Sequence, residues 1–276
     1  LMQIERISEH VYWFQSEVYA QVTAGVIVGN QWAVVIDTLA IPEETLELRR
    51  FVEEELNIPV RYIINTHHHA DHAWGNCFFP GSYVVAHELC RKEMAAQGTE
   101  ALKAAAEHDQ QFKQTKLILP QFTFDTGSIN LEVGKKTLKL FHTPGHSLDS
   151  ISVLAVEDRI LFAGDAILPV PFIADGDVEL MRQSLHNIRE LSLENIIQGH
   201  GDVILRGEVQ DTIDNNLDYL EKTETAVKQL INDKKPETAL SKITIESCGK
   251  SRIVLNGIAE ELHQSNLRTL YNYYKD

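Results

Sequence analysis

The first third of the chain alternates short apolar runs with polar turns, a pattern that predicts strands around one helix. Runs rich in β-branched and aromatic residues predict strands at 11–18, 24–30 and 32–37. Gly29 and Asn30 form a turn signal before the third run and predict a hairpin. Pro42 then opens a helix with acidic residues in its first turn, and a strand at 60–65 follows.

The rest of the chain continues this mixture of strands and helices. Further strands are predicted at 81–87, 117–124, 128–133, 136–142, 150–158, 159–165 and 195–199. Helices are predicted at 88–116, at 178–191 and from about 207, where apolar residues recur at helical spacing. No linker, repeat or low-complexity block separates two parts. We expect one domain over 1–276, with two sheets covered by helices and a helical extension at about 207–276 packed on it.

Composition narrows the classes of partner. The 276 residues are 43% hydrophobic, which is enough for a sizeable core. Acidic residues outnumber basic ones by 40 to 25, so the net charge of −15 disfavours nucleic acid. No apolar run is long enough to span a bilayer, so we expect a small-molecule substrate and no membrane partner. The oligomeric state is not predicted.

The cysteines and the start of the chain bear on its compartment. Cys77, Cys90 and Cys248 are too few and too irregularly spaced for a disulfide framework. The first ten residues lack the charged start and apolar stretch of a signal peptide. Both features lead us to expect a cytoplasmic protein.

The stretch INTHHHADHAWGN carries four histidines and one aspartate within six positions. In an extended segment, His67 and His69 face one side and His68 faces the other. Asp71 and His72 follow where the chain must turn. Two imidazoles would then face one metal ion, and a carboxylate with an imidazole would face a neighbouring one. Such ligands suit zinc, and also iron or manganese; the alternative is a solvated histidine-rich loop.

Three later strands each end in a small residue followed by a potential ligand. The segments FHTPGHS, LFAGDA and IIQGHGD place His146, Asp165 and His200 at these ends. Glycine at such ends lets the backbone approach a crowded centre. Each side chain alone could serve an ordinary turn or a surface loop. Together with the histidine cluster, the three favour a metal site.

The segments THHHADH, TPGHS, FAGD and GHG, in this order, resemble the metallo-β-lactamase superfamily of hydrolases. The resemblance covers about residues 10–202 and is nearest to the glyoxalase-II-like and lactonase-like branches. It implies an α/β fold, a four-layer αββα sandwich that holds its metals at one edge. It also implies an enzyme whose chemistry depends on two metal ions.

The resemblance also assigns roles to individual residues. It implies that His67, His69 and His146 bind one metal ion, that Asp71, His72 and His200 bind a second, and that Asp165 bridges both. Asp37 matches the family's early aspartate and would orient a ligand rather than bind metal. His68 has no ligand role and is expected to pack or hydrogen-bond below the site.

A pair of zinc ions would make hydroxide available near neutral pH, because a metal-bound water has its pKa lowered to about 7. The resemblance therefore implies that a metal-bridging hydroxide attacks the carbonyl of an ester, thioester, lactone or lactam. Asp71 would be the catalytic residue, because it can orient this nucleophile and pass a proton to the leaving atom.

The region after the bridging aspartate bears on the substrate. Asp165 itself favours the thioesterase and lactonase branches over true β-lactamases. The following segment AILPVPFIADGD lacks the arginine-containing run of the glyoxalase-II-like branch and the tyrosine of the acyl-homoserine lactonases. The apolar loop 168–172 and Trp74 could line a pocket for an acyl or lactone substrate, or simply pack on the core.

Several alternatives stay open at this level. One is a true β-lactamase, and another is an oxidoreductase that resembles the persulfide dioxygenases with one iron ion. A third is a metal-containing binding protein without turnover. The helices at 88–116 and after 207 are expected to pack on the body rather than to act as lids.

Overall fold

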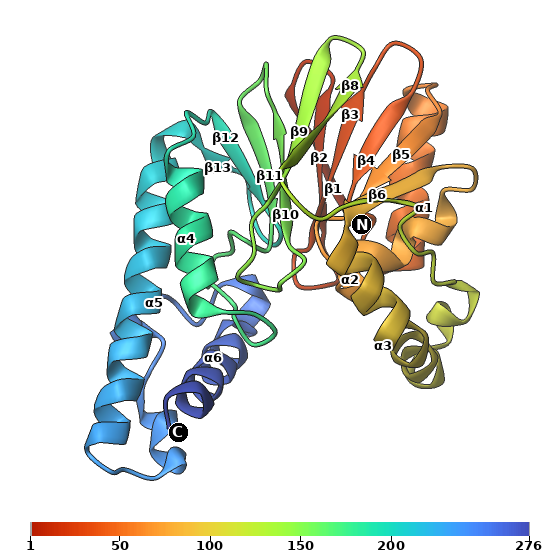
Figure 1. Cartoon of the computed structure of the whole chain (residues 1–276). Coiled ribbons are helices and arrows are strands. Elements are labelled where there is room, and N and C mark those ends of the chain that lie inside the picture. The colour runs from red at the N-terminus through yellow and green to blue at the C-terminus, as the bar shows by residue number, and fades with distance from the viewer. Residues whose placement is uncertain (1, 276) are drawn as a thin grey trace.

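Two β-sheets pack face to face with helices on both outer sides in the computed structural model, which describes residues 2–275 (Figure 1). The first sheet contains, in spatial order, β1 (Met2–Ser8), β2 (Val11–Ser16), β3 (Thr23–Val28), β4 (Ala33–Ile36), β5 (Val60–Ile64), β6 (Tyr83–His87) and β7 (Phe122–Phe124). The second contains β13 (Ile204–Leu205), β12 (Asn195–Gln198), β11 (Ile160–Gly164), β10 (Ile151–Ala155), β9 (Lys136–His142) and β8 (Ser128–Val133). This arrangement is the αββα sandwich that the sequence predicts.

The helices cover the outer faces of the two sheets. The first sheet is covered by α1 (Pro42–Arg50), which continues as a π-helical turn at Phe51–Glu55, and by α3 (Glu88–His108). The second sheet is covered by α4 (Val178–Arg189) and α5 (Val209–Asn232), and α6 (Ala259–Tyr274) lies against α5. Short 3-10 turns connect α5 to α6.

Alternation along β4 shows how the layers form. Val34 and Ile36 belong to the apolar core between the two sheets. Ala33 and Val35 point the other way and pack with Leu48 of α1. A strand that is buried on both faces needs a continuous apolar run, and AVVI is such a run.

The predicted elements are mostly confirmed, with differences at weakly patterned segments. The hairpin at Gly29 is present, since β3 and β4 pair antiparallel and the Gly29 N–H donates to the Trp32 carbonyl at 3.0 Å. The predicted helix 88–116 ends earlier, at His108, and a 3-10 turn follows. The strand predicted at 117–124 covers only Phe122–Phe124, because Pro120 has no N–H to donate to a strand ladder. The edge strands β1 and β13 were not predicted.

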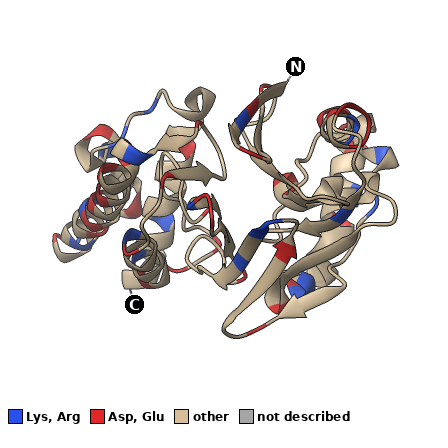
Figure 2. Cartoon of the chain, turned by 90° about the horizontal axis from the view of Figure 1, so that it is seen from above, with Lys and Arg blue, Asp and Glu red and all other residues tan. Residues whose placement is uncertain are grey.

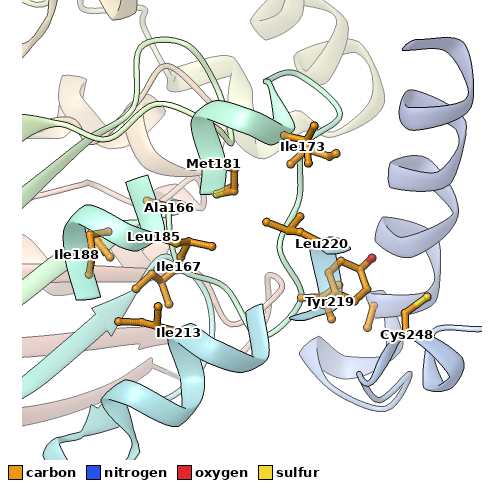
Figure 3. Packing of buried hydrophobic residues seen from close by; sticks show 14 of the residues in the cluster. Ala166, Ile167, Ile173, Met181, Leu185, Ile188, Ile213, Tyr219, Leu220 and Cys248 are labelled. Carbon is orange, nitrogen blue, oxygen red and sulfur yellow. The ribbon is translucent and has the colours of Figure 1, made fainter. Parts of the chain in front are cut away.

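The largest apolar cluster joins the second sheet to α4, α5 and α6. Figure 3 shows part of it, with Leu185 of α4 and Ile167 near Ile213 of α5 and with Tyr219 and Cys248 toward the C-terminal helices. The extension therefore shares its core with the sandwich.

The surface carries mixed charge, and the thiols are free. Seen from above, Lys and Arg are interspersed with Asp and Glu over the helices (Figure 2). Cys77, Cys90 and Cys248 form no disulfide. Over the described residues 2–275, no helix combines the length and apolar character that a membrane crossing requires.

Candidate metal centre

Loops at one edge of the sandwich bring all seven predicted ligands together. The loop after β5 carries His67 and His69, and the short helix α2 (Ala70–Ala73) carries Asp71 and His72. The other three follow β9, β11 and β12 and are His146, Asp165 and His200. These loops meet between α2 and α6 in Figure 1. The residues form two groups, each with potential ligand atoms within 4.8 Å of one another: His67, His69, His146 and Asp165, and Asp71, His72 and His200.

The first group converges on one point. His69 Nδ1 lies 3.1 Å from His67 Nε2 and 3.0 Å from His146 Nε2. Asp165 Oδ2 lies 3.3 Å from His146 Nε2 and 3.9 Å from His67 Nε2. Three imidazole nitrogens and a carboxylate oxygen make a donor set that suits zinc.

The second group lies on the other side of Asp165. Asp71 Oδ2 is 3.3 Å from His200 Nε2 and 4.0 Å from His72 Nε2. Asp165 Oδ1 is 3.3 Å from His72 Nε2, and its Oδ2 is 3.7 Å from His200 Nε2. The Asp165 carboxylate thus stands between the two groups and is close to both.

Two unsatisfied atoms indicate that the centre fits a metal. His72 Nε2 and Asp165 Oδ1 are buried, and neither has a hydrogen-bond partner among the described residues. A buried polar atom without a partner is costly, so such atoms are rare in folded proteins. A cation at this point would satisfy both.

Hydrogen bonds fix which nitrogen of each ring faces the centre. The Nδ1 atoms of four rings lie close to acceptors outside the centre: His67 to Thr66 Oγ1 (3.1 Å), His72 to Asp37 Oδ2 (2.9 Å), His146 to the Phe172 carbonyl (2.9 Å) and His200 to the Ala20 carbonyl (2.9 Å). With these protons on Nδ1, each Nε2 presents a lone pair to the centre. His69 is reversed: its Nε2 lies 3.3 Å from Asp175 Oδ2, and its Nδ1 faces the centre.

Asp37 orients the loop rather than joining the ligands. Its backbone is left-handed, with φ of 56°, directly after β4. Its carboxylate accepts from the Thr66 N–H and from the Thr66 hydroxyl, each at 2.7 Å, and from His72 Nδ1. Strained backbone of this kind is held where the surroundings require a particular side-chain position.

Glycine is required where backbone meets the bridging carboxylate. A Cβ at Gly199 would stand 1.8 Å from Asp165 Oδ1. Gly164, directly before Asp165, has φ of +51° and would meet the Thr66 side chain at 2.7 Å. Any side chain at either position would therefore displace the centre.

His68 points away from the centre, as the alternation predicts. Its Nδ1 lies 2.9 Å from Asp149 Oδ1. Burial lowers the pKa of His68, but the bond to Asp149 and the negative charges of Asp149, Glu93 and Asp175 together outweigh burial, so the pKa is raised. His68 and Asp149 therefore form an ion pair beside the centre.

The pKa values of the histidines differ between the two groups of the metal-free centre. Burial lowers the pKa of His67 well below its usual value and that of His146 to about 4, so both rings are neutral at pH 7. Burial would raise the pKa of Asp165, but the neighbouring imidazoles, His200 foremost, lower it well below its usual value. For His72 and His200, burial lowers the pKa, but the nearby carboxylates, Asp165 most strongly, raise it by more, so the pKa of each ring is raised overall. The carboxylates therefore attract positive charge to this site.

A pocket of ≈ 200 Å³ opens directly over both groups. Leu168 and Phe172 of the predicted apolar loop line it, as do Tyr19 and the ligands themselves. Its remaining wall comes from the extension: Leu255, Ile258 and Leu262. The tail therefore forms part of this wall in addition to packing on the body. Trp74 lines a neighbouring cavity instead.

Sequence reasoning missed several residues at the centre. Asp175 lies in the segment IADGD, and Tyr19 lies in the turn after β2; neither belongs to a motif. The Asp71 carboxylate raises the pKa of Tyr19, which places its phenol within electrostatic reach of the centre. Leu255 and Ile258 follow no pattern that distinguishes a pocket wall from a core position.

Two buried asparagines of the extension hold the apolar loop. Asn216 of α5 donates to the Leu168 carbonyl at 3.1 Å. Asn266 of α6 donates to the Pro171 carbonyl at 2.7 Å and accepts from the Ile173 N–H at 3.0 Å. Between these contacts lies Phe172, whose carbonyl oxygen accepts a hydrogen bond from His146 Nδ1. The extension thereby supports a potential metal ligand through the loop.

The chain is similar to one known protein family and to several of its members. The sequence profile described as "Metallo-beta-lactamase superfamily" matches residues 19–207. A Caenorhabditis elegans protein named "Beta-lactamase-like protein 2 homolog" is 26% identical over 197 residues, which are 71% of this chain and 60% of that protein. A "Hydroxyacylglutathione hydrolase" of Rhodopseudomonas palustris (strain BisB5) is 32% identical over 131 residues, which are 47% of this chain and 43% of that protein.

A solved structure gives the same picture of the fold. The "Metallo-beta-lactamase from Pontibacter korlensis" superposes with a TM-score of 0.62 at 21% identity and covers 78% of this chain and 100% of its own. The chain spans 60% or less of the length of the two curated relatives it was compared with.

Proposed function

Because this chain belongs to the metallo-beta-lactamase superfamily, we propose that it is a hydrolase with two zinc ions that cleaves the acyl bond of an ester, thioester, lactone or lactam. The observation that carries the proposal is the Asp165 carboxylate, which lies between two groups of potential ligands and keeps one oxygen unsatisfied. His67, His69 and His146 would hold one ion, and Asp71, His72 and His200 the other.

The chemistry divides between the ions and the side chains. When bound, the ions would lower the pKa of a water molecule and polarise the substrate carbonyl. Asp71 lines the pocket over the centre. Burial raises the pKa of Asp71, but His72 and His200 more than offset this, so Asp71 stays a carboxylate at neutral pH. In that state it can orient the nucleophile and carry a proton to the leaving atom.

The pocket supports an apolar substrate around the carbonyl. Leu168, Phe172, Leu255 and Ile258 surround a volume of ≈ 200 Å³, which suits a small apolar group next to the carbonyl. The relative named hydroxyacylglutathione hydrolase has an acyl substrate in its name.

Metal analysis and a substrate panel test the proposal. Protein purified without added metal would be analysed for metal content and assayed on thioesters, lactones, a chromogenic lactam and a phosphodiester. We expect about two zinc ions per chain, carbonyl hydrolysis that a chelator abolishes and zinc restores, and one ion fewer in Asp165→Asn. One iron per chain with oxygen uptake on a persulfide would refute the proposal, as would phosphodiester cleavage alone.

A further inference from the structure

A second cavity of ≈ 430 Å³ adjoins the centre and has no part in the proposed chemistry. We call it the α3 pocket, because α3 forms one wall through Leu89, Glu93, Met94 and Ala101. His69 lines both this cavity and the pocket over the metal groups. A substrate whose carbonyl lies at the centre can therefore extend past His69 into the α3 pocket.

The wall of the α3 pocket is largely apolar. Trp74, Leu89, Met94 and Leu148 contribute aromatic and aliphatic surface. Trp74 is only 9% exposed and is held edge-to-face against Phe112, so this part of the wall is rigid. Such a surface favours a hydrocarbon chain over a polar one.

Most of the charged side chains in the α3 pocket are acidic. Glu93, Asp149 and Asp175 line it, and neither Lys nor Arg does. Two histidines line it as well, and each already faces a carboxylate: His68 Nδ1 lies 2.9 Å from Asp149 Oδ1, and His69 Nε2 lies 3.3 Å from Asp175 Oδ2. The remaining charge is negative, so the pocket attracts a cation and repels an anion.

One buried oxygen in the wall still lacks a donor. Asp149 is 1% exposed, and its Oδ2 has no hydrogen-bond partner among the described residues. An oxygen that is buried in this way is costly unless a donor reaches it. A protonated amine at the end of a hydrocarbon chain would match the negative charge of this carboxylate.

The position of Asp71 indicates which arm of the substrate enters. The leaving atom must receive a proton, and Asp71 is the proposed carrier. Asp71 lines the pocket over the centre but not the α3 pocket. The leaving arm therefore lies on the Asp71 side, and the acyl arm lies on the His69 side.

We propose that the α3 pocket binds the acyl arm of the substrate and selects an aliphatic chain that ends in a protonated amine over one that ends in a carboxylate. This inference rests on the proposed hydrolase function. In the reaction, water adds its oxygen to the acyl carbon, the bond to the leaving sulfur or oxygen breaks, and the leaving atom takes a proton.

Three ethyl thioesters that differ only in the end group of the acyl chain test the selection. 6-Aminohexanoyl, heptanoyl and pimeloyl thioesters carry an ammonium, a methyl and a carboxylate group on the same five methylenes. We expect kcat/KM to fall in this order, by about tenfold between the first and the last at low salt, and the difference to shrink as salt is added. Equal kcat/KM values, or preference for the carboxylate, would overturn the inference.

Variants on α3 test whether the preference between end groups arises in the α3 pocket. Glu93→Gln removes one charge from the pocket and should narrow the ratio of ammonium to carboxylate substrate by about twofold to threefold. Glu100→Gln makes the same change on an exposed part of the same helix outside the pocket and should leave the ratio unchanged. Ala101→Trp fills the cavity and should raise KM for the six-carbon arm while an acetyl thioester keeps its KM.

The outcomes separate the inference from the function on which it rests. If none of the thioesters is hydrolysed with zinc supplied, and no lactone or lactam is either, then the proposed function fails. If the heptanoyl thioester is hydrolysed but Glu93→Gln and Ala101→Trp change nothing, then the function stands and the assignment of the α3 pocket is wrong.

Discussion

Asp165 is the residue that connects the two groups of potential ligands. Its Oδ2 faces His146 and His200, and its Oδ1 faces His72 without a hydrogen bond. The carboxylate reaches this position because Gly164 and Gly199 bring the backbone close on both sides. The geometry of the centre therefore depends on the glycines as well as on the ligands.

Adjacent histidines should respond differently to truncation. His69→Ala should lose the first metal ion and reduce activity by more than about a hundredfold, because its Nδ1 is one of three converging nitrogens. His68→Ala should keep both ions, because its ring is bonded to Asp149. Metal content after dialysis against zinc measures both, and loss of an ion from His68→Ala would show that the two roles are exchanged.

Gly199→Ala tests the close approach of the backbone. The added methyl would stand 1.8 Å from Asp165 Oδ1 and must displace it, which should weaken metal affinity by about tenfold to a hundredfold. Gly207→Ala is the control, since an added Cβ there meets nothing within 4 Å. Zinc affinity is measured by competition with a chelating dye, and equal affinity in Gly199→Ala and wild type would contradict the steric argument.

Individual site residues could be predicted from the sequence where a motif places several types of ligand at a fixed spacing. The seven residues that the motifs indicate converge in space because each follows a strand that ends at the same edge. Asp175 and Tyr19 could not be found in this way. Their proximity to His69 and Asp71 depends on how loops far apart in sequence pack, and no local pattern records that.

The loop from Leu168 to Ile173 is the element that joins the extension to the centre. It is held at one end by Asn216 and at the other by Asn266. Its Phe172 carbonyl accepts a hydrogen bond from His146 Nδ1. Ile173 lies in the apolar cluster with Tyr219 and Leu220 (Figure 3). Polar and apolar contacts from the extension therefore fix the same loop.

Asn266→Leu should affect both stability and metal binding. It leaves the Pro171 carbonyl and the Ile173 N–H without their partner, which should cost about 2–4 kcal/mol in free energy of unfolding. It should also weaken the first metal ion, because the loop that supports His146 is released. Urea denaturation and zinc titration measure the two effects. Asn272→Leu, an exposed change on the same helix, should produce neither; lower stability with unchanged zinc affinity would limit Asn266 to a structural role.

Element prediction succeeded where periodicity was strong and failed where it was not. The buried run of β4 and the amphipathic α5 were both recognisable. The edge strand β1 alternates charged and apolar residues over MQIERIS but lies in a segment without flanking turn signals. The contribution of α6 and the residue before it to the pocket wall could not be predicted either. Ile258 and Leu262 have the same sequence pattern as apolar residues that only pack in a core.

At the scale of the whole molecule, buried histidines make stability depend on pH. His67 and His146 have lowered pKa values in the fold, so unfolding lets them take up protons as the pH falls below 6.5. His72 and His200 have raised pKa values, so their contribution is complete below pH 6.5 and is lost as the pH rises through their folded values. The metal-free protein should therefore be most stable near pH 6.5.

Urea denaturation of the metal-free protein at pH 4.5, 6.5 and 8.5 measures this dependence. The His146 shift from 6.5 to about 4 corresponds to a loss of about 3 kcal/mol once the pH has fallen through that window. His146→Gln should flatten the acid side and leave the alkaline side in place. Stability that rises steadily from pH 6.5 to pH 4.5 would contradict the assignment of neutral, buried rings.

The two asparagine contacts also have a consequence for the order in which the protein is completed during synthesis. All seven potential ligands have been translated by residue 200, yet the loop beneath His146 receives its second anchor only from Asn266. A nascent chain that has left the ribosome as far as β13 contains the strands of both sheets but cannot close this loop. The loop that supports His146 is thus completed only after more than sixty further residues have emerged. This delay gives the sandwich time to fold before the centre can act on a substrate.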